Sequence, residues 1–157
     1  MTTNKKSLSM AEKTATVSIV AVENYLNPEL ILESLRSSLA VFGGMSSIVS
    51  PGQKVLLKVN LLAPSAPDRA VTTHPEILRA AIKLVKEAGG IACVGDGPGV
   101  GDTVTNMKAC GLHKVVEEEG AVVLPFDETE VFEKLDNRVG KRVSLTKHLN
   151  DCPVVIS

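Results

Sequence analysis

The sequence is poor in the residues that stack on bases or cross membranes. Its 157 residues include no tryptophan, one tyrosine and three phenylalanines, which argues against an aromatic platform for single-stranded nucleic acid. No apolar run approaches the roughly 20 residues of a membrane span. Residues 1–13 are polar and basic and lack the apolar core of a signal peptide. The sequence therefore predicts a cytoplasmic protein with no nucleic-acid partner and no membrane partner.

A large excess of charge of either sign is also missing. The 17 basic and 18 acidic residues give a formal net charge of −1, so a partner held mainly through phosphate contacts, as nucleic acids are, is not expected. The hydrophobic fraction of 44% is typical of a globular protein. We expect residues 1–13 to form a flexible leader and residues 14–157 to form a single domain.

Cysteine is scarce, and the closely spaced pairs that bind metals are missing. Cys93, Cys110 and Cys152 include no C-x-x-C pair, and an odd number of cysteines without a secretion signal is typical of reduced thiols. The spacing leaves open a metal site shared by all three, but buried thiols are the preferred interpretation. We therefore expect no metal and no cofactor in this chain.

Strand-like and helix-like segments alternate along the chain. The expected strands are 16–22, 54–59, 91–94, 121–126 and 154–156. Helices of ordinary length between parallel strands form right-handed βαβ units. The predicted fold is a three-layer α/β domain with a mostly parallel sheet and helices on both faces.

Three segments predict where helices begin. Asn27 followed by Pro28 provides an N-cap and a proline at the first helical position. The T-x-x-E pattern from Thr73 to Glu76 predicts a capping box, in which both side chains accept backbone hydrogen bonds at the helix start. Asp102 is expected to cap the helix that follows a glycine-rich loop.

The chain ends on the apolar strand 154–156, which only Ser157 follows. A buried parallel strand normally leads into a loop and another element. We therefore expect the domain to be incomplete at its carboxyl end, with a natural end as the alternative. Apolar surface exposed in this way predicts self-association or pairing with a missing carboxyl-terminal segment.

The clearest sign of a binding site is the glycine-rich loop. Four glycines alternate over the seven positions 95–101, directly after the strand 91–94. Glycine lets backbone N–H groups approach a ligand closely. The loop matches neither G-x-G-x-x-G nor G-x-x-x-x-G-K-[ST], so it does not name the ligand.

Further polar residues gather where the predicted parallel strands end, the edge at which α/β proteins bind ligands. Lys58 lies in an apolar strand and needs a partner, because an unpaired buried ammonium is costly. Asp96 or a bound anion would serve, whereas an exposed position would let Lys58 reach water. We expect an anionic small molecule to bind here. The candidate ligand-binding residues are Lys58, Asn60, Thr73, His74, Asp96, Gly97, Gly99 and Gly101.

His74 has both a functional and a structural interpretation. The positive end of a helix dipole disfavours its protonation, and a neutral imidazole could donate a hydrogen bond or bind a metal. A lone histidine is more often part of the surface structure. No nucleophile elbow, H-E-x-x-H, EF-hand loop or P-loop is present. The sequence therefore identifies no catalytic residue and does not decide whether the protein is an enzyme.

Four motifs in order resemble the family catalogued as domain of unknown function 362. They are KVLLKVNLL over 54–62, TTHPE over 72–76, VKEAGG over 85–90 and VGDGPG over 94–99. Family members usually have Lys-Pro-Asn where this chain has Lys58, Val59 and Asn60, a departure that keeps both polar residues.

The resemblance implies a longer domain. In the family, a strand like 154–156 normally continues into a basic segment rich in lysine and histidine. Some members also carry a ferredoxin-type module of clustered cysteines, so an iron–sulfur cluster in a parent protein is implied by association. The activity of the family is not established, and the resemblance names no reaction.

Three functions stay open on the sequence. The first is a domain of a larger enzyme that binds an anionic small molecule at the strand carboxyl edge. The second is a redox-associated protein whose parent carries an iron–sulfur ferredoxin module. The third is a non-catalytic assembly fragment.

Overall fold

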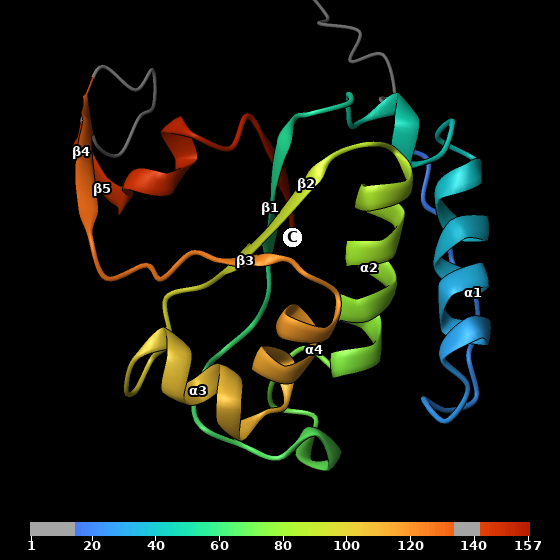
Figure 1. Ribbon diagram of the computed structural model, residues 1–157, viewed down its shortest axis with the longest axis horizontal. Coiled ribbons are helices and arrows are strands. Elements are labelled where there is room, and N and C mark those ends of the chain that lie inside the picture. Colours follow the sequence, from blue (N-terminus) through green and yellow to red (C-terminus); the bar gives the residue numbers. More distant parts are fainter. Residues whose placement is uncertain (1–14, 134–141) are drawn as a thin grey trace, which may run out of the picture.

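The computed structural model describes residues 15–133 and 142–157, so the leader expected over residues 1–13 lies outside the described residues. The described part forms a four-stranded parallel sheet, four α-helices and a separate two-stranded hairpin (Figure 1). This arrangement confirms the predicted α/β class and the parallel sheet.

The sheet has the strand order β3–β2–β1–β6, and each neighbouring pair is parallel. β1 (Lys54–Lys58) and β2 (Ile91–Gly95) lie at its centre, and β3 (Val122–Val123) and β6 (Val154–Ile156) form its edges. The central strands are nearly continuous apolar runs, as expected for strands that are covered on both faces.

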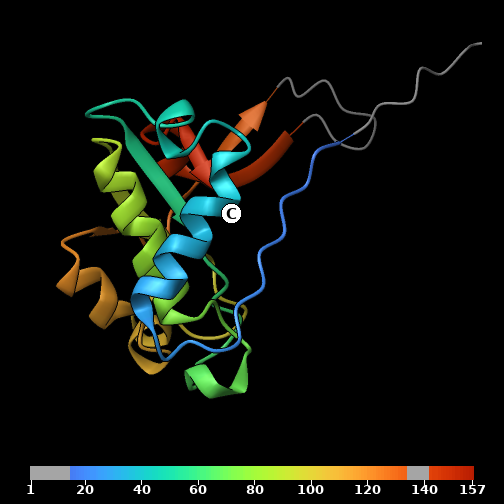
Figure 2. The ribbon, with the colours of Figure 1, turned by 90° about the vertical axis from the view of Figure 1, so that its right-hand side faces the viewer.

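The four α-helices of the described residues pack on one face of the sheet. α1 (Pro28–Ala40) and α2 (Pro75–Glu87) lie side by side over this face in both ribbon views (Figures 1 and 2), and α3 (Thr103–Ala109) and α4 (Leu112–Glu118) complete the layer. None of these helices is long and apolar enough to cross a membrane. The core that they share with the sheet includes Ile31, Val55, Leu57, Leu61, Leu78, Ile82, Val85, Val94, Met107, Leu112 and Val115.

The other face of the sheet has a smaller covering. The 3-10 helix η3 (Lys147–Asn150) and the hairpin of β4 (Thr129–Glu133) and β5 (Arg142–Thr146) stand on this side, to the left of the sheet in Figure 1. The buried side chains here are Leu56, Cys93 and Cys152, with Leu124, Phe126 and Leu149 packed against them. The second outer layer is thus a hairpin and a single 3-10 turn, where the sequence led us to expect helices.

Two expected strands differ from the structure. Residues 16–22 form no strand and are largely exposed, with Ile19 at 89%. Apolar alternation yields a strand only beside another strand that can accept and donate its backbone hydrogen bonds, and no strand of the described residues pairs with this segment. The strand expected over 121–126 is reduced to Val122–Val123. The backbone N of Leu124 still donates to the Val94 carbonyl at 2.8 Å, and Pro125, whose ring fixes φ, follows it as the chain leaves the sheet.

The starts of α1 and α3 follow the prediction, whereas that of α2 does not. The Asn27 and Asp102 side chains accept hydrogen bonds from the first turns of α1 and α3. The N-cap of α2 is His74, whose Nδ1 accepts from the backbone N of Glu76 at 3.2 Å. The capping box expected between Thr73 and Glu76 is therefore wrong, because the Thr73 hydroxyl bonds elsewhere.

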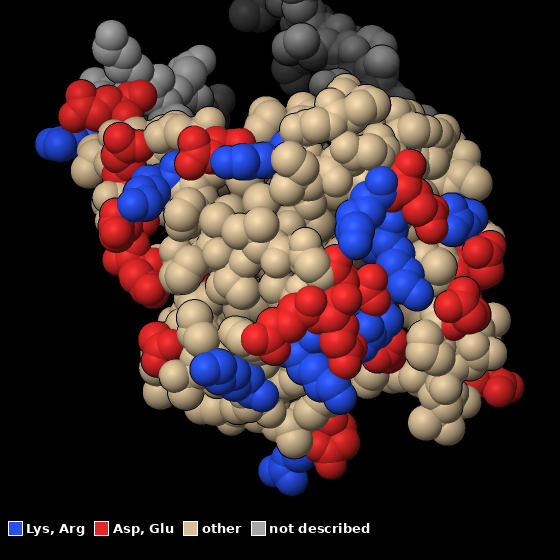
Figure 3. Space-filling model, viewed as in Figure 1, with Lys and Arg blue, Asp and Glu red and all other residues tan. Residues whose placement is uncertain are grey.

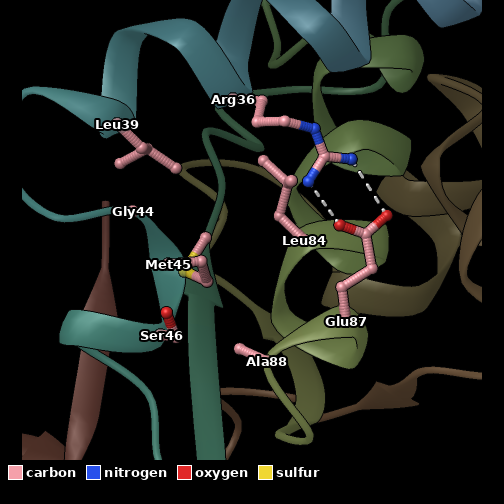
Figure 4. A pocket seen from close by; sticks show the side chains of 8 residues that line it. All are labelled: Arg36, Leu39, Gly44, Met45, Ser46, Leu84, Glu87 and Ala88. Atoms are coloured by element: carbon pink, nitrogen blue, oxygen red, sulfur yellow. Dashed lines mark hydrogen bonds and ion pairs between the residues drawn. The ribbon is translucent and has the colours of Figure 1, made fainter.

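An ion pair ties α1 to the carboxyl-terminal end of α2. Arg36 donates two hydrogen bonds to Glu87, at 2.7 and 3.1 Å, beside a hollow of about 300 Å³ (Figure 4). The bond to Arg36 lowers the pKa of the Glu87 carboxyl. The 3-10 helix η1 (Met45–Ser47), which precedes β1, closes one side of the hollow. The hollow therefore lies at the amino end of the strands, and we assign the ion pair a structural role.

Candidate functional site

Lys58 and Asp96 meet at the carboxyl edge of the sheet. Lys58 ends β1 and lies opposite Gly95 of β2, and Asp96 follows directly. The Nζ atom of Lys58 is 3.0 Å from Oδ1 of Asp96; the lysine side chain is 37% exposed and the aspartate side chain 11%. Of the alternatives that the sequence left open for Lys58, the structure shows the pairing with Asp96, and each charge offsets the cost of burying the other.

The ammonium of Lys58 has further oxygen neighbours. Its Nζ donates to the Val59 carbonyl at 3.1 Å and to Oδ1 of Asn60 at 3.5 Å. An ammonium has three hydrogens to donate, and a bond of 3.5 Å is at the long end of the range. A ligand oxygen could replace the Asn60 contact and leave the pair with Asp96 intact.

Asp96 is held rigidly by two neighbouring segments. Its Oδ2 atom accepts a hydrogen bond from the backbone N of Leu61 at 2.9 Å, and its backbone carbonyl accepts one from the Thr103 hydroxyl at 3.0 Å. Leu61 belongs to the loop after β1 and Thr103 to the first turn of α3. Asp96 therefore connects both loops at this edge of the sheet and fixes where the Lys58 ammonium lies.

Thr73 positions Asn60. The Thr73 hydroxyl accepts from the backbone N of Asn60 at 2.9 Å, and the backbone N of Thr73 donates to the Asn60 carbonyl at 3.1 Å. These two bonds close the long loop between β1 and the 3-10 helix η2 (Pro67–Arg69) against the start of α2. We assign Thr73 a supporting place next to the site, because it fixes the backbone of Asn60.

These residues surround a cavity of about 410 Å³, within the size range of small-molecule sites. It is lined by Lys58, Asn60, Leu61, Leu62, Val71, Asp96, Gly97 and Gly99. The structure thus brings together Lys58, Asn60, Asp96, Gly97 and Gly99 around one space. Thr73 contacts this group through Asn60, whereas His74 and Gly101 do not line the cavity.

Gly101 has a structural reason to be glycine. Its φ is +78°, and a Cβ atom there would lie 3.2 Å from Oδ1 of Asn106. Asn106, which the sequence reasoning missed, is fully buried on α3 and donates to the carbonyls of Val100 at 2.6 Å and Leu61 at 3.4 Å. Through these two hydrogen bonds, Asn106 links the loop after β1 to the glycine-rich loop after β2. The sequence carried no clear signal for it, because the short helix TVTNMKA mixes polar and apolar residues.

Asp102 fills the amino end of α3. Its Oδ1 atom accepts from the backbone N of Thr105 at 2.9 Å, and this hydrogen bond lowers the pKa of the Asp102 carboxyl. The carboxylate occupies part of the helix terminus that an anion would otherwise use. Among the residues that line the cavity, Lys58 is the one cation.

His74 lies in a different place. Its ring stacks on Tyr25, with the ring centroids 3.7 Å apart and the planes 13° apart, and it lines a separate hollow with Thr72. Burial lowers the pKa of His74, against the opposing charge of Glu76. Because Nδ1 already accepts from the Glu76 backbone, we assign His74 to the start of α2.

The three cysteines are divided between the two faces of the sheet. Cys93 and Cys152 belong to the cluster below the hairpin, and Cys110 belongs to the core below the helices. Burial raises the pKa of the Cys93 thiol to about 11. In the described part of the chain, no three His, Cys, Asp or Glu side chains are grouped to hold a metal ion. Cys110 thus lies on the opposite face of the sheet from Cys93 and Cys152.

The comparisons with known proteins give one curated relative and no solved structure that matches the chain. The relative is the thylakoid-associated protein of Synechocystis, which is 45% identical over 85 residues. The aligned region covers 54% of this chain and 26% of the relative, so the chain matches about a quarter of the relative's length.

The family comparison covers the whole site. The profile of the domain of unknown function DUF362 matches residues 55–157, which include β1, the Asn60 loop, the glycine-rich loop and β6. The match extends over more than half of the chain and confirms the resemblance seen in the four sequence motifs. This chain belongs to the DUF362 family.

Proposed function

We propose that the domain binds a small molecule through an anionic group at the carboxyl edge of its sheet, as part of a larger enzyme. The observation that carries the proposal is the position of the Lys58 ammonium at the wall of a cavity. One of its hydrogen bonds, to Oδ1 of Asn60, is long at 3.5 Å and could be replaced by a bond to a ligand. The amide of Asn60 and the backbone at Gly97 lie around the same space. Such a set can hold a phosphate or a carboxylate.

The paired carboxylate limits how tightly an anion binds. Asp96 neutralises Lys58, so the ligand gains mainly directed hydrogen bonds and little net charge attraction. We therefore expect modest affinity for a bare anion. An uncharged polar group on the ligand would gain less, because a charge-assisted hydrogen bond is roughly twice as strong as a neutral one.

The test measures the affinity of inorganic phosphate and of acetate by NMR titration for the wild type and two lysine variants. Lys58→Met should lower the affinity for the more tightly bound of the two anions by about tenfold, because the charge-assisted hydrogen bond is lost. Lys54→Met is the matched control, since Lys54 lies at the other end of the same strand and is exposed. Equal losses in both variants, or no loss in Lys58→Met, would contradict the proposal.

A further inference from the structure

A second cavity adjoins the anion site on the face of the sheet that carries the hairpin. It measures about 390 Å³ and lies between the sheet and the β4–β5 hairpin. Leu56 and Val155 form its floor on the sheet, and Phe126, Leu145 and Leu149 form its walls. We call this space the apolar groove. Figure 3 shows uncharged surface between the charged outer edge of the hairpin and the charged surface over α2 and α4.

The apolar groove adjoins the anion site. Lys58 and Gly97 line both cavities and form their common border. Side chains two positions apart on a strand share a face, which places Lys58 on the same side of β1 as Leu56. The aliphatic stem of Lys58 therefore continues the floor of the groove, and its ammonium marks the polar end.

Gly97 stands at the junction without a structural need to be glycine. A Cβ atom at this position would meet only the Phe126 side chain, at 3.9 Å, an ordinary contact distance, and the φ of Gly97 is not in the left-handed region. The neighbouring Gly95 is different, because its Cβ would lie 2.3 Å from the Leu124 carbonyl. A side chain at Gly97 would occupy space at the common border of the two cavities.

The walls of the groove are fixed in place by polar contacts outside it. Lys147 pairs with Glu128, and Asn150 donates a hydrogen bond to Glu130, so η3 is tied to β4 and to the turn before it. The ring Nε2 of His148 lies 3.0 Å from the Pro125 carbonyl. A groove held open in this way leaves apolar side chains in contact with water, including Leu145 at 40% and Val155 at 48% exposure. An apolar ligand would release that water.

We propose that the ligand of this domain is amphipathic, with its anionic group at Lys58 and an apolar body, about the size of a bicyclic aromatic ring, in the apolar groove. This inference rests on the proposed function, because it uses the same cation. The two adjoining cavities supply complementary surfaces for such a molecule: the ammonium of the Lys58–Asp96 pair at one end and a mainly apolar lining along the rest. The ligand class is therefore aryl or alkyl phosphates and carboxylates.

The experiment compares three probes on the 157-residue chain: inorganic phosphate, 1-naphthyl phosphate and 1-naphthol. Wild-type protein should bind 1-naphthyl phosphate at least about tenfold more tightly than inorganic phosphate, because the ring buries apolar surface. It should also bind 1-naphthyl phosphate more tightly than 1-naphthol, which lacks the anion. Lys58→Met should remove the advantage over 1-naphthol.

A matched pair of hairpin variants locates the ring. Leu145→Gln removes an apolar wall and should abolish most of the advantage of 1-naphthyl phosphate while leaving phosphate affinity unchanged. Val131→Gln changes a similarly exposed side chain of the same hairpin outside the groove lining and should have no effect. If Leu145→Gln disturbs the hairpin, Val155→Thr is the second groove variant, because it keeps the shape of the floor.

The outcomes separate this inference from the proposed function. Equal affinities for phosphate and 1-naphthyl phosphate would overturn the inference and leave the proposed anion site intact. Failure of both phosphates to bind would overturn both. Tight binding of 1-naphthol that Lys58→Met does not change would show an apolar pocket without an anion end, and would overturn the inference. A dimer in sedimentation that Leu145→Gln dissociates would assign the groove to a second copy of the chain, with the same consequence.

Discussion

The proposed binding chemistry depends on one pair of opposite charges at the ends of neighbouring strands. Lys58 supplies a cation at the end of β1, and Asp96 both neutralises it and fixes the loop after β1 through the Leu61 amide. The pair is a structural clamp and also the polar end of a cavity. Removing one partner should therefore change stability and binding in ways that can be measured separately.

Replacing Asp96 with asparagine tests how far the carboxylate opposes an anion. Asp96→Asn leaves Lys58 without its counter-charge, so inorganic phosphate should bind several-fold more tightly, about tenfold at low salt. The free energy of unfolding should fall by about 1–3 kcal/mol, because the hydrogen bonds to Leu61 and Lys58 are weakened. Glu33→Gln on α1 changes the net charge equally on the opposite face and is the control. Unchanged or weaker phosphate binding in Asp96→Asn would show that the ammonium does not face the ligand.

Two neighbouring glycines should respond differently to alanine. Gly95→Ala places a Cβ atom 2.3 Å from the Leu124 carbonyl and 2.7 Å from the Phe126 ring, and it should destabilise the fold by about 1–3 kcal/mol or more. Gly97→Ala meets nothing closer than 3.9 Å, and it should leave the midpoint of thermal unfolding unchanged while weakening 1-naphthyl phosphate. A Gly97→Ala protein that is as destabilised as Gly95→Ala would indicate that Gly97 serves the fold.

At the scale of elements, the central apolar strands and the caps of α1 and α3 were predictable, and weak patterns were not. The runs that became β1, β2 and β6 are recognisable because central parallel strands are apolar throughout. The hairpin β4–β5 was not predicted, since its residues mix charged and apolar side chains and are largely exposed. Because the hairpin was not predicted, and it forms one wall of the apolar groove, the sequence could indicate the anion site but not the groove.

The start of α2 shows how tertiary contacts decide between two nearby caps. Thr73 and His74 can both accept a backbone hydrogen bond, and the sequence pattern favours Thr73. In the structure the Thr73 hydroxyl serves the Asn60 backbone, a partner 13 residues away, which leaves the cap to His74. A pattern confined to four residues cannot reveal such a partner.

The capping role of His74 predicts a pH dependence. Its pKa is lowered below the usual 6.5 by burial, so the unfolded chain takes up the proton first as the pH falls. Stability should therefore be fully present above about pH 6.5 and decrease as the pH falls below it. His74→Asn keeps a cap and removes the titration, so its stability should change less between pH 7 and pH 5. The free energy of unfolding of both proteins is measured with urea at pH 7 and pH 5. An equal change between the two pH values in the wild type and in His74→Asn would contradict this role.

At the scale of the molecule, the sheet is covered unequally on its two faces. Within residues 15–133 and 142–157, four α-helices pack on one face, and the hairpin with η3 covers part of the other, where the groove leaves Leu145 and Val155 half-exposed. The loops that follow the two central strands both begin at the same edge of the sheet, as the parallel topology requires. The charged clamp and the groove thus meet at one place because of the strand order. The self-association predicted from the sequence stays a prediction that sedimentation would test.

The central claim concerns where an anion binds, and an amide NMR titration with inorganic phosphate tests it most directly. We predict that phosphate shifts the backbone amides of Asn60, Leu61, Gly97 and Gly99, and that Lys58→Met abolishes these shifts. The amides near the Arg36–Glu87 pair, at the opposite end of the strands, should not move. Shifts confined to that region, or shifts at Gly97 that persist in Lys58→Met, would contradict the account.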